Sequence, residues 1–233
     1  MRLEATADNV SIVLLGAFNP KIFHPAWLAM HGLISPEQAD DADVVIVHSD
    51  ITQFTAAYMT FDINSGQFVI KCDTIHKDVI RDLVLAAFGE HLPHTPVWRL
   101  GINRSISFSC GSDDIRNKFG TLLAPKIPWG PWGSELEQSM SEDGHHGGMI
   151  RLIMRQLPRP DGLSGHIQAD IRPGPGERSN VIADINNHFA FRDADETIGS
   201  VDAMEILFDR WQASMEGAEN IVDGLMATME DLK

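Results

Sequence analysis

The C-terminal segment of the chain carries an uninterrupted apolar stripe. The spacing between its apolar residues alternates between three and four, at Val201, Met204, Phe208, Trp211, Met215, Ala218, Val222, Leu225, Met229 and Leu232. This spacing predicts one long helix with an apolar side, which must be buried against a sheet or a second chain. Gly217 leaves open whether the helix is continuous, because glycine destabilises a helix by roughly 1 kcal/mol relative to alanine.

The positions that flank the stripe help to distinguish the two possible partners of the helix. A coiled coil carries charges of both signs there, but only Glu205 and Glu219 are charged in this chain. Leu207, Ile221 and Met226 make the apolar side wider than a two-helix seam. We therefore expect the helix to pack on the chain's own sheet. The alternative is a homo-oligomer interface made by Leu207, Trp211, Ile221, Leu225 and Met226.

The clearest predicted strand is Val97–Cys110, where apolar and small polar residues alternate. Strict alternation predicts a strand with one buried face and one polar face. The polar face is either open to solvent or closely covered by another element. Arg104 interrupts the apolar face. A buried arginine there needs a carboxylate, backbone carbonyls or an anionic ligand, unless the strand has already reached the rim of the sheet.

Alternating strands elsewhere favour an α+β fold, mainly an antiparallel sheet with helices packed on one face and a long C-terminal helix. We expect a single domain over residues 1–233. Phe61-Asp62-Ile63-Asn64 and Ala183-Asp184-Ile185-Asn186 form a weak internal echo. This echo allows two similar halves, 10–123 and 149–233, each a hairpin plus a helix. An irregular segment rich in Trp, Gly and Pro, 124–148, would join them.

The charge of the chain limits its partners. The net charge is −15, which makes binding to nucleic acid or to an anionic membrane surface unlikely. An acidic mimic of nucleic acid stays open as a third functional hypothesis. Cys72 and Cys110 do not form a motif, so we expect reduced thiols and a cytoplasmic location. No apolar run is long enough to cross a membrane.

Polar residues that share one face of a predicted strand form the best candidate for chemistry. Asp184, Asn186 and His188 are spaced by two residues, and a carboxylate with an imidazole can perform acid–base work. The simpler interpretation is a solvent-facing strand surface. Asp170 and Asp62 would join this group only if the sheet brings them close.

Two further candidates lie in segment 124–148. Trp129 and Trp132 stand in a turn-rich loop. We expect them to cover the edge of the core; the alternative is that they are exposed and anchor a partner. His145 and His146 are adjacent and could bind a metal, although their spacing is not that of a known zinc site and a solvated loop is the simpler interpretation. We expect no cofactor, because no nucleotide-binding or nucleophile motif occurs.

Three phrases of the sequence resemble bacterial proteins known only as hypothetical. They are residues 14–27 (LLGAFNPKIFHPAW), 94–104 (HTPVWRLGINR) and 123–129 (LAPKIPW). The resemblance covers most of the chain, but this family has no known activity. It therefore implies no cofactor and no catalytic residue.

The sequence favours a non-enzymatic interaction or assembly protein as the leading functional hypothesis. Its partner would be a second copy or another protein, bound through the C-terminal helix, the tryptophan loop, or both. The alternative is an enzyme for a small anionic substrate, with a site near Arg104 and the strand face of Asp184 and His188. The enzyme hypothesis requires a pocket that gathers these three residues.

Overall fold

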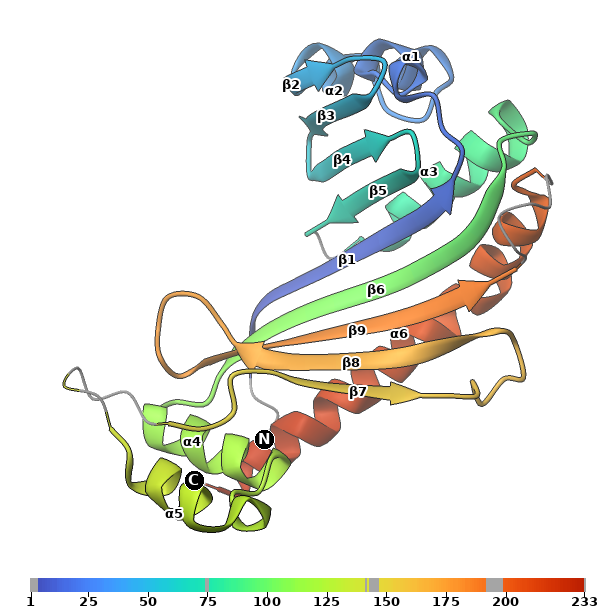
Figure 1. Ribbon diagram of the computed structural model, residues 1–233. Coiled ribbons are helices and arrows are strands. Elements are labelled where there is room, and N and C mark those ends of the chain that lie inside the picture. The colour runs from blue at the N-terminus through green and yellow to red at the C-terminus, as the bar shows by residue number, and fades with distance from the viewer. Residues whose placement is uncertain (1–3, 74–75, 141, 143–146, 192–198, 233) are drawn as a thin grey trace.

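The computed structural model describes residues 4–73, 76–140, 142, 147–191 and 199–232. Its centre is one antiparallel sheet of nine strands in the order β2-β3-β4-β5-β1-β6-β9-β8-β7 (Figure 1). The strands are β1 (Ala5–Gly16), β2 (Asp43–Val47), β3 (Ile51–Ala56), β4 (Met59–Asn64), β5 (Gln67–Cys72), β6 (Val97–Ser109), β7 (Leu152–Gln156), β8 (Gly165–Pro173) and β9 (Asn180–Ala190).

Most helices connect successive strands along the chain, and one long helix follows the last strand. They are α1 (Pro25–Met30), α2 (Pro36–Asp40), α3 (Asp78–Ala86), α4 (Asp113–Leu123), α5 (Gly130–Gln138) and α6 (Val201–Glu230), with the short helical turns η1 (Pro20–Ile22), η2 (Ala87–His91) and η3 (Ile127–Trp129). The expected α+β class with an antiparallel sheet and a long C-terminal helix is confirmed. In the described part of the chain, no helix has the length and apolar character needed to cross a membrane.

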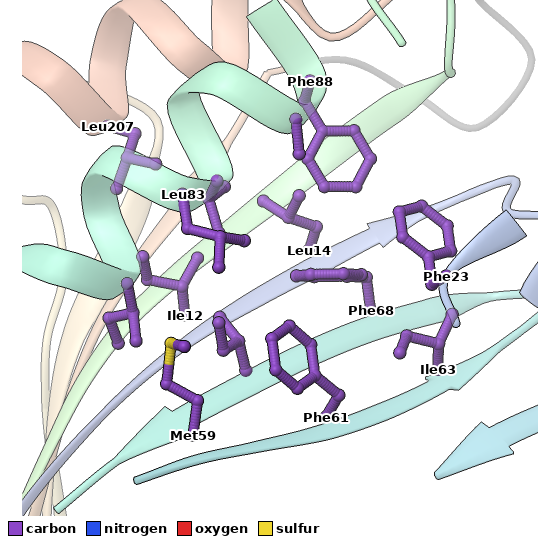
Figure 2. Packing of buried hydrophobic residues seen from close by; sticks show 14 of the residues in the cluster. Ile12, Leu14, Phe23, Met59, Phe61, Ile63, Phe68, Leu83, Phe88 and Leu207 are labelled. Atoms are coloured by element: carbon purple, nitrogen blue, oxygen red, sulfur yellow. The ribbon is translucent and has the colours of Figure 1, made fainter. Parts of the chain in front are cut away.

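Alternation along the strands buries one face of the sheet under helices. A first core cluster joins β1, β3, β4, β5 and the N-terminal part of β6 to α1, α3 and the N-terminal half of α6. Figure 2 shows Phe61, Phe68 and Ile12 packed toward Leu83 and Leu207 in this cluster. A second core cluster joins the C-terminal part of β6, together with β8 and β9, to α4 and the C-terminal half of α6.

Helix α6 therefore packs on the sheet of its own chain, and it is continuous through Gly217. Leu207, Trp211 and Met226 are buried in the core. They are core residues, so the homo-oligomer interface that the sequence allowed at these positions is not available on the surface. Ile221 and Leu225 are half-buried and also pack on the second core cluster.

At the N-terminal end of α6, the residues that are buried differ from those that the heptad spacing predicts. Val201 and Phe208 belong to the stripe but are exposed, whereas Leu207 and Ser214 are buried. A straight helix has 3.6 residues per turn, so a repeat of 3.5 drifts by about 20° per heptad. Without a supercoiling partner the helix follows its own period, and the buried side rotates away from the heptad positions.

One local prediction differs from the structure. The segment 124–148, predicted to be irregular, contains η3 and α5. Proline at the second position of α5 suits a helix start. Elsewhere, a tight turn with Ala57 at φ 53° joins β3 to β4, and a capping box formed by Ser35 and Gln38 begins α2.

The burial of α6 gives a direct test of this packing. Trp211 is 1% exposed and Phe208 is 70% exposed, although both belong to the apolar stripe. Truncating Trp211 to alanine removes a buried aromatic and should lower the free energy of unfolding by about 3–5 kcal/mol. Phe208→Ala should change it by less than about 0.5 kcal/mol. Urea denaturation of both variants measures the difference, and equal effects would contradict this orientation of α6.

Candidate functional site

The face of the sheet that turns away from α3 and α6 is lined by polar side chains, and we call it the polar face. In Figure 1 this face looks toward the viewer, and α6 runs behind β8 and β9. The cross-strand register defines which residues share it, because directly paired residues point to the same side. Asn103 pairs with Ser11 on β1 and with Asn186 on β9, so all three lie on the polar face.

Following the register outward from Asn103 shows a polar residue on every strand. On one side Ser11 pairs with Lys71, which pairs with Thr60. On the other side Asn186 pairs with Gln168. The complete set, which we call the polar row, runs across the sheet as Asp43, Thr55, Thr60, Lys71, Ser11, Asn103, Asn186, Gln168 and Arg155. No apolar side chain interrupts it.

The middle of the polar row lies in an open hollow, which we call the central hollow, with a volume of ≈ 630 Å³. The polar and charged residues that line it are Asn9, Ser11, Thr55, Tyr58, Thr60, Lys71, Asp73, Asn103, Arg104, Ser105, Arg172, Asp184 and Asn186, although the guanidinium of Arg104 is directed to the other side of the sheet. Asn103 Nδ2 donates a hydrogen bond to Ser11 Oγ at 3.3 Å. Asn186 Oδ1 is buried and has no hydrogen-bond partner in the structure.

Charged side chains at one end of the central hollow neutralise one another. Arg172 forms an ion pair with Asp184 and lies 3.6 Å from Asp170. Arg151 also binds the carboxylate of Asp170. Asp170 and Asp184 are directly paired across β8 and β9, so the structure does bring these two predicted acids together. Asp62 is on β4, four strands from β9 in the order of the sheet, and hydrogen-bonds to Gln53.

Arg104 points to the opposite side of the sheet, where it lies between the two core clusters. It pairs with the buried Ile185 across β6 and β9, so its side chain lies on the helix-covered face. Its Nε and Nη2 donate to the two carboxylate oxygens of Asp8 at 3.0 and 2.9 Å, and it also binds Glu219 of α6. Lys77 binds Asp8 as well.

This pairing explains why an arginine is stable in an apolar face. Burial alone would lower the pKa of Arg104, but the hydrogen bonds and charges of Asp8 and Glu219 raise it. Burial would likewise raise the pKa of Asp8, whereas Arg104 and Lys77 together hold it below its ordinary value. The partner of Arg104 is therefore a set of carboxylates. The enzyme hypothesis requires Arg104, Asp184 and His188 in one pocket. Arg104 and Asp184 both line the central hollow, but the guanidinium of Arg104 is directed to the other side of the sheet and His188 is not part of the lining.

His188 lies on the polar face next to a second histidine. The rings of His188 and His166 stack with their centroids 4.7 Å apart. Burial, together with the nearby His166, Arg99, Arg155 and Arg159, lowers the pKa of His188 to about 4. Burial, Arg155 and Arg159 lower the pKa of His166 too. At neutral pH this is therefore a pair of neutral imidazoles beside arginines, outside the central hollow.

The predicted tryptophan pair is exposed, which corrects the expectation that it covers the core. Trp129 and Trp132 form an edge-to-face pair with centroids 5.4 Å apart. Ile127, which is 92% exposed, and Leu122 also present apolar side chains in this part of the chain. We call Leu122, Ile127, Trp129 and Trp132 the tryptophan surface. It ends shortly before the segment that holds His145 and His146, which lie outside the described residues.

A second exposed apolar region is the edge strand β2. All five of its residues are exposed, and four are aliphatic: Val44, Val45, Ile46 and Val47. Among the described residues the strand pairs with β3 alone, so its other side presents unpaired backbone groups. Within the same residues, no cluster of His, Cys, Asp and Glu could hold a metal ion.

Comparison with known proteins adds no assignment. No family model matches the chain, and no curated relative matches it. A solved structure that it resembles is the di-domain ARO/CYC StfQ from the steffimycin biosynthetic pathway, at 11% identity and a TM-score of 0.29, covering 97% of this chain and 100% of that chain. A likeness this distant carries no inference about the site.

The ion pairs of Arg104 predict a large effect of its removal. Arg104→Ala leaves Asp8 and Glu219 half-buried without their shared cation and should lower the free energy of unfolding by about 3 kcal/mol. The matched variant is Arg155→Ala, because Arg155 is exposed and, among the described residues, hydrogen-bonds to the neutral amide of Gln168. That change should stay below about 0.5 kcal/mol in urea denaturation. Similar losses in both variants would contradict the network.

The low pKa of His188 predicts a pH dependence of stability. Its pKa falls from 6.5 to about 4 on folding, so the unfolded state binds more protons between these values. Stability should therefore decrease as the pH is lowered through this window. His188→Asn should flatten the decrease, and His166→Asn should move the titration of His188 to higher pH because it removes a nearby cause of the shift. Denaturation at several pH values and histidine NMR measure both, and an unchanged slope in His188→Asn would refute the assignment.

Proposed function

We propose that this chain is an assembly protein that associates with a second copy through the edge strand β2. The observation that carries this proposal is the exposure of every residue of β2, four of which are aliphatic. Edge strands of single proteins are usually protected by short length, a bulge, charged or proline residues, or a covering element. Strand β2 is short and has a bulge, but lysine, arginine and proline are absent from it, and its apolar side chains are directed to both faces of the sheet.

The sequence of β2 suits antiparallel pairing with itself. The strand begins with Asp43, and His48 follows its last residue, so the pairing of two copies places each aspartate near the histidine of the other copy. The four aliphatic residues then meet one another in the middle. A bulge leaves Val45 outside the ladder with β3 and 72% exposed. Val45 is therefore the side chain with most area to lose to a partner.

A two-fold pairing of this kind closes after two copies and adds no further unpaired edge at β2. Its area is that of two short strands, so we expect a weak or transient dimer rather than an obligate one. Helix α6 does not contribute, since its apolar side is already buried on the sheet. The tryptophan surface stays free in such a dimer and is suited to a different protein partner.

Analytical ultracentrifugation across a range of concentrations tests the proposal. The unmodified chain should show a monomer–dimer equilibrium. Val45→Lys places a charge in the middle of the pairing and should weaken the dimer by about tenfold or more, while the fold stays intact. The matched control is Met154→Lys on the other edge strand, β7, because Met154 is also largely exposed at 65%. This control should dimerise as the unmodified chain does.

The other results each contradict the proposal. A monomer at every concentration rules out self-association. Loss of the dimer in Met154→Lys alone assigns the contact to β7. Loss of the dimer in a Trp129→Ser, Trp132→Ser double variant, with Val45→Lys unaffected, assigns it to the tryptophan surface.

A further inference from the structure

We propose that the central hollow binds a neutral, hydroxyl-rich small molecule of the carbohydrate class. This site is independent of β2 and of the assembly proposed above. It lies on the one face of the sheet that α3 and α6 leave open (Figure 1). Its volume of ≈ 630 Å³ falls within the range of small-molecule sites, about 300–1,000 Å³.

The lining selects the chemical class of the ligand. Most small-molecule pockets are mainly apolar. This hollow presents polar and apolar surface in similar amounts, and its polar side chains are mostly amides and hydroxyls. An asparagine amide offers donors and an acceptor, and a hydroxyl group offers both. The hydroxyls of a sugar have the same dual capacity, so they can pair with Asn103, Asn186 and Ser11 in turn. An apolar ligand would bury these groups without partners, which is costly.

The charges around the hollow argue against an ionic ligand. Lys71 and Arg172 face the lining carboxylates Asp73 and Asp184, so their formal charges cancel. Arg172 already forms an ion pair with Asp184. The guanidinium of Arg104 is directed to the other side of the sheet and is held by Asp8. An anion would therefore meet two carboxylates as well as Lys71, and it would gain no net attraction.

The centre of the polar row also has unused hydrogen-bonding capacity. Asn186 Oδ1 is buried without a partner, and such an acceptor costs free energy until it is satisfied. A rotation of the Asn186 amide toward the hollow would let a sugar hydroxyl donate to this acceptor.

Tyr58 supplies the remaining element of a sugar site. It lies in the turn between β3 and β4, lines the hollow and is partly exposed. Its ring presents an apolar surface and its hydroxyl a polar end. The C–H side of a sugar ring packs on such a surface while its hydroxyls reach the asparagines. The hollow thus combines one aromatic wall with a floor of amides and hydroxyls.

Titration of the ¹⁵N-labelled full chain, followed by NMR, tests the proposal. The probes are glucose, maltose and N-acetylglucosamine as neutral sugars, inorganic phosphate as an anion and indole as an apolar ligand. At least one sugar should shift the side-chain amide signals of Asn103 and Asn186. Asn103→Leu and Asn186→Leu should each weaken that binding by about tenfold, which corresponds to the loss of one or two hydrogen bonds.

The matched control is Gln53→Leu, which removes an amide from the polar face outside the hollow and should bind as the unmodified chain does. If a leucine variant does not fold, Asn103→Ser and Asn186→Ala replace it. Absence of a shift with all three sugars overturns the proposal, as does binding of phosphate or indole in their place. Val45→Lys should bind the sugar unchanged, so this test and the test of assembly fail or succeed separately.

Discussion

The structure depends on the ion pairs of Arg104, which separate the two clusters of the core. Arg104 in the middle of β6 holds Asp8 of β1 and Glu219 of α6, and it lies between the first and the second core cluster. Close by, Asn187 Nδ2 donates to the carbonyl oxygen of Ser214 at 3.4 Å. Because each polar group has a partner, a single helix can cover both clusters without leaving a buried charge between them.

This arrangement of the helices determines where binding can occur. Since α1, α3, α4 and α6 all pack into the core on one face, the other face keeps its polar side chains open. A long antiparallel sheet covered on one side only is a common solution for chains whose strands alternate. Here the polar row contributes one polar residue from each strand to the open face. The central hollow lies over the middle of the sheet, around β1 and β6.

The sequence was informative where the signal is local. The alternation of Val97–Cys110 identified the two faces of β6, and the apolar stripe identified α6 and its packing on the sheet. The need of Arg104 for a partner could also be read from its position. Its partners could not, because Asp8 and Glu219 lie roughly a hundred residues away on either side, and only the folded sheet brings them together.

The polar row could not be identified from the sequence for the same reason. Asn103, Ser11 and Lys71 are unremarkable surface residues along the chain, and they become a row only through strand register. Nothing local in the aliphatic run of residues 44–47 shows that β2 lies at an edge of the sheet. For the tryptophan loop, Gly and Pro were interpreted as breakers, although Pro131 stands where a proline favours the start of a helix.

The division of the core has a consequence for how the molecule opens. The second core cluster contains small and flexible side chains such as Ala183, Ala218 and Met226, whereas the first contains most of the buried aromatic residues. Fluctuations that expose backbone amides follow such differences in local packing. The C-terminal half of α6 is therefore the part that exchanges its amide hydrogens sooner, and Arg104 marks the border at which the slower, more cooperative unit begins.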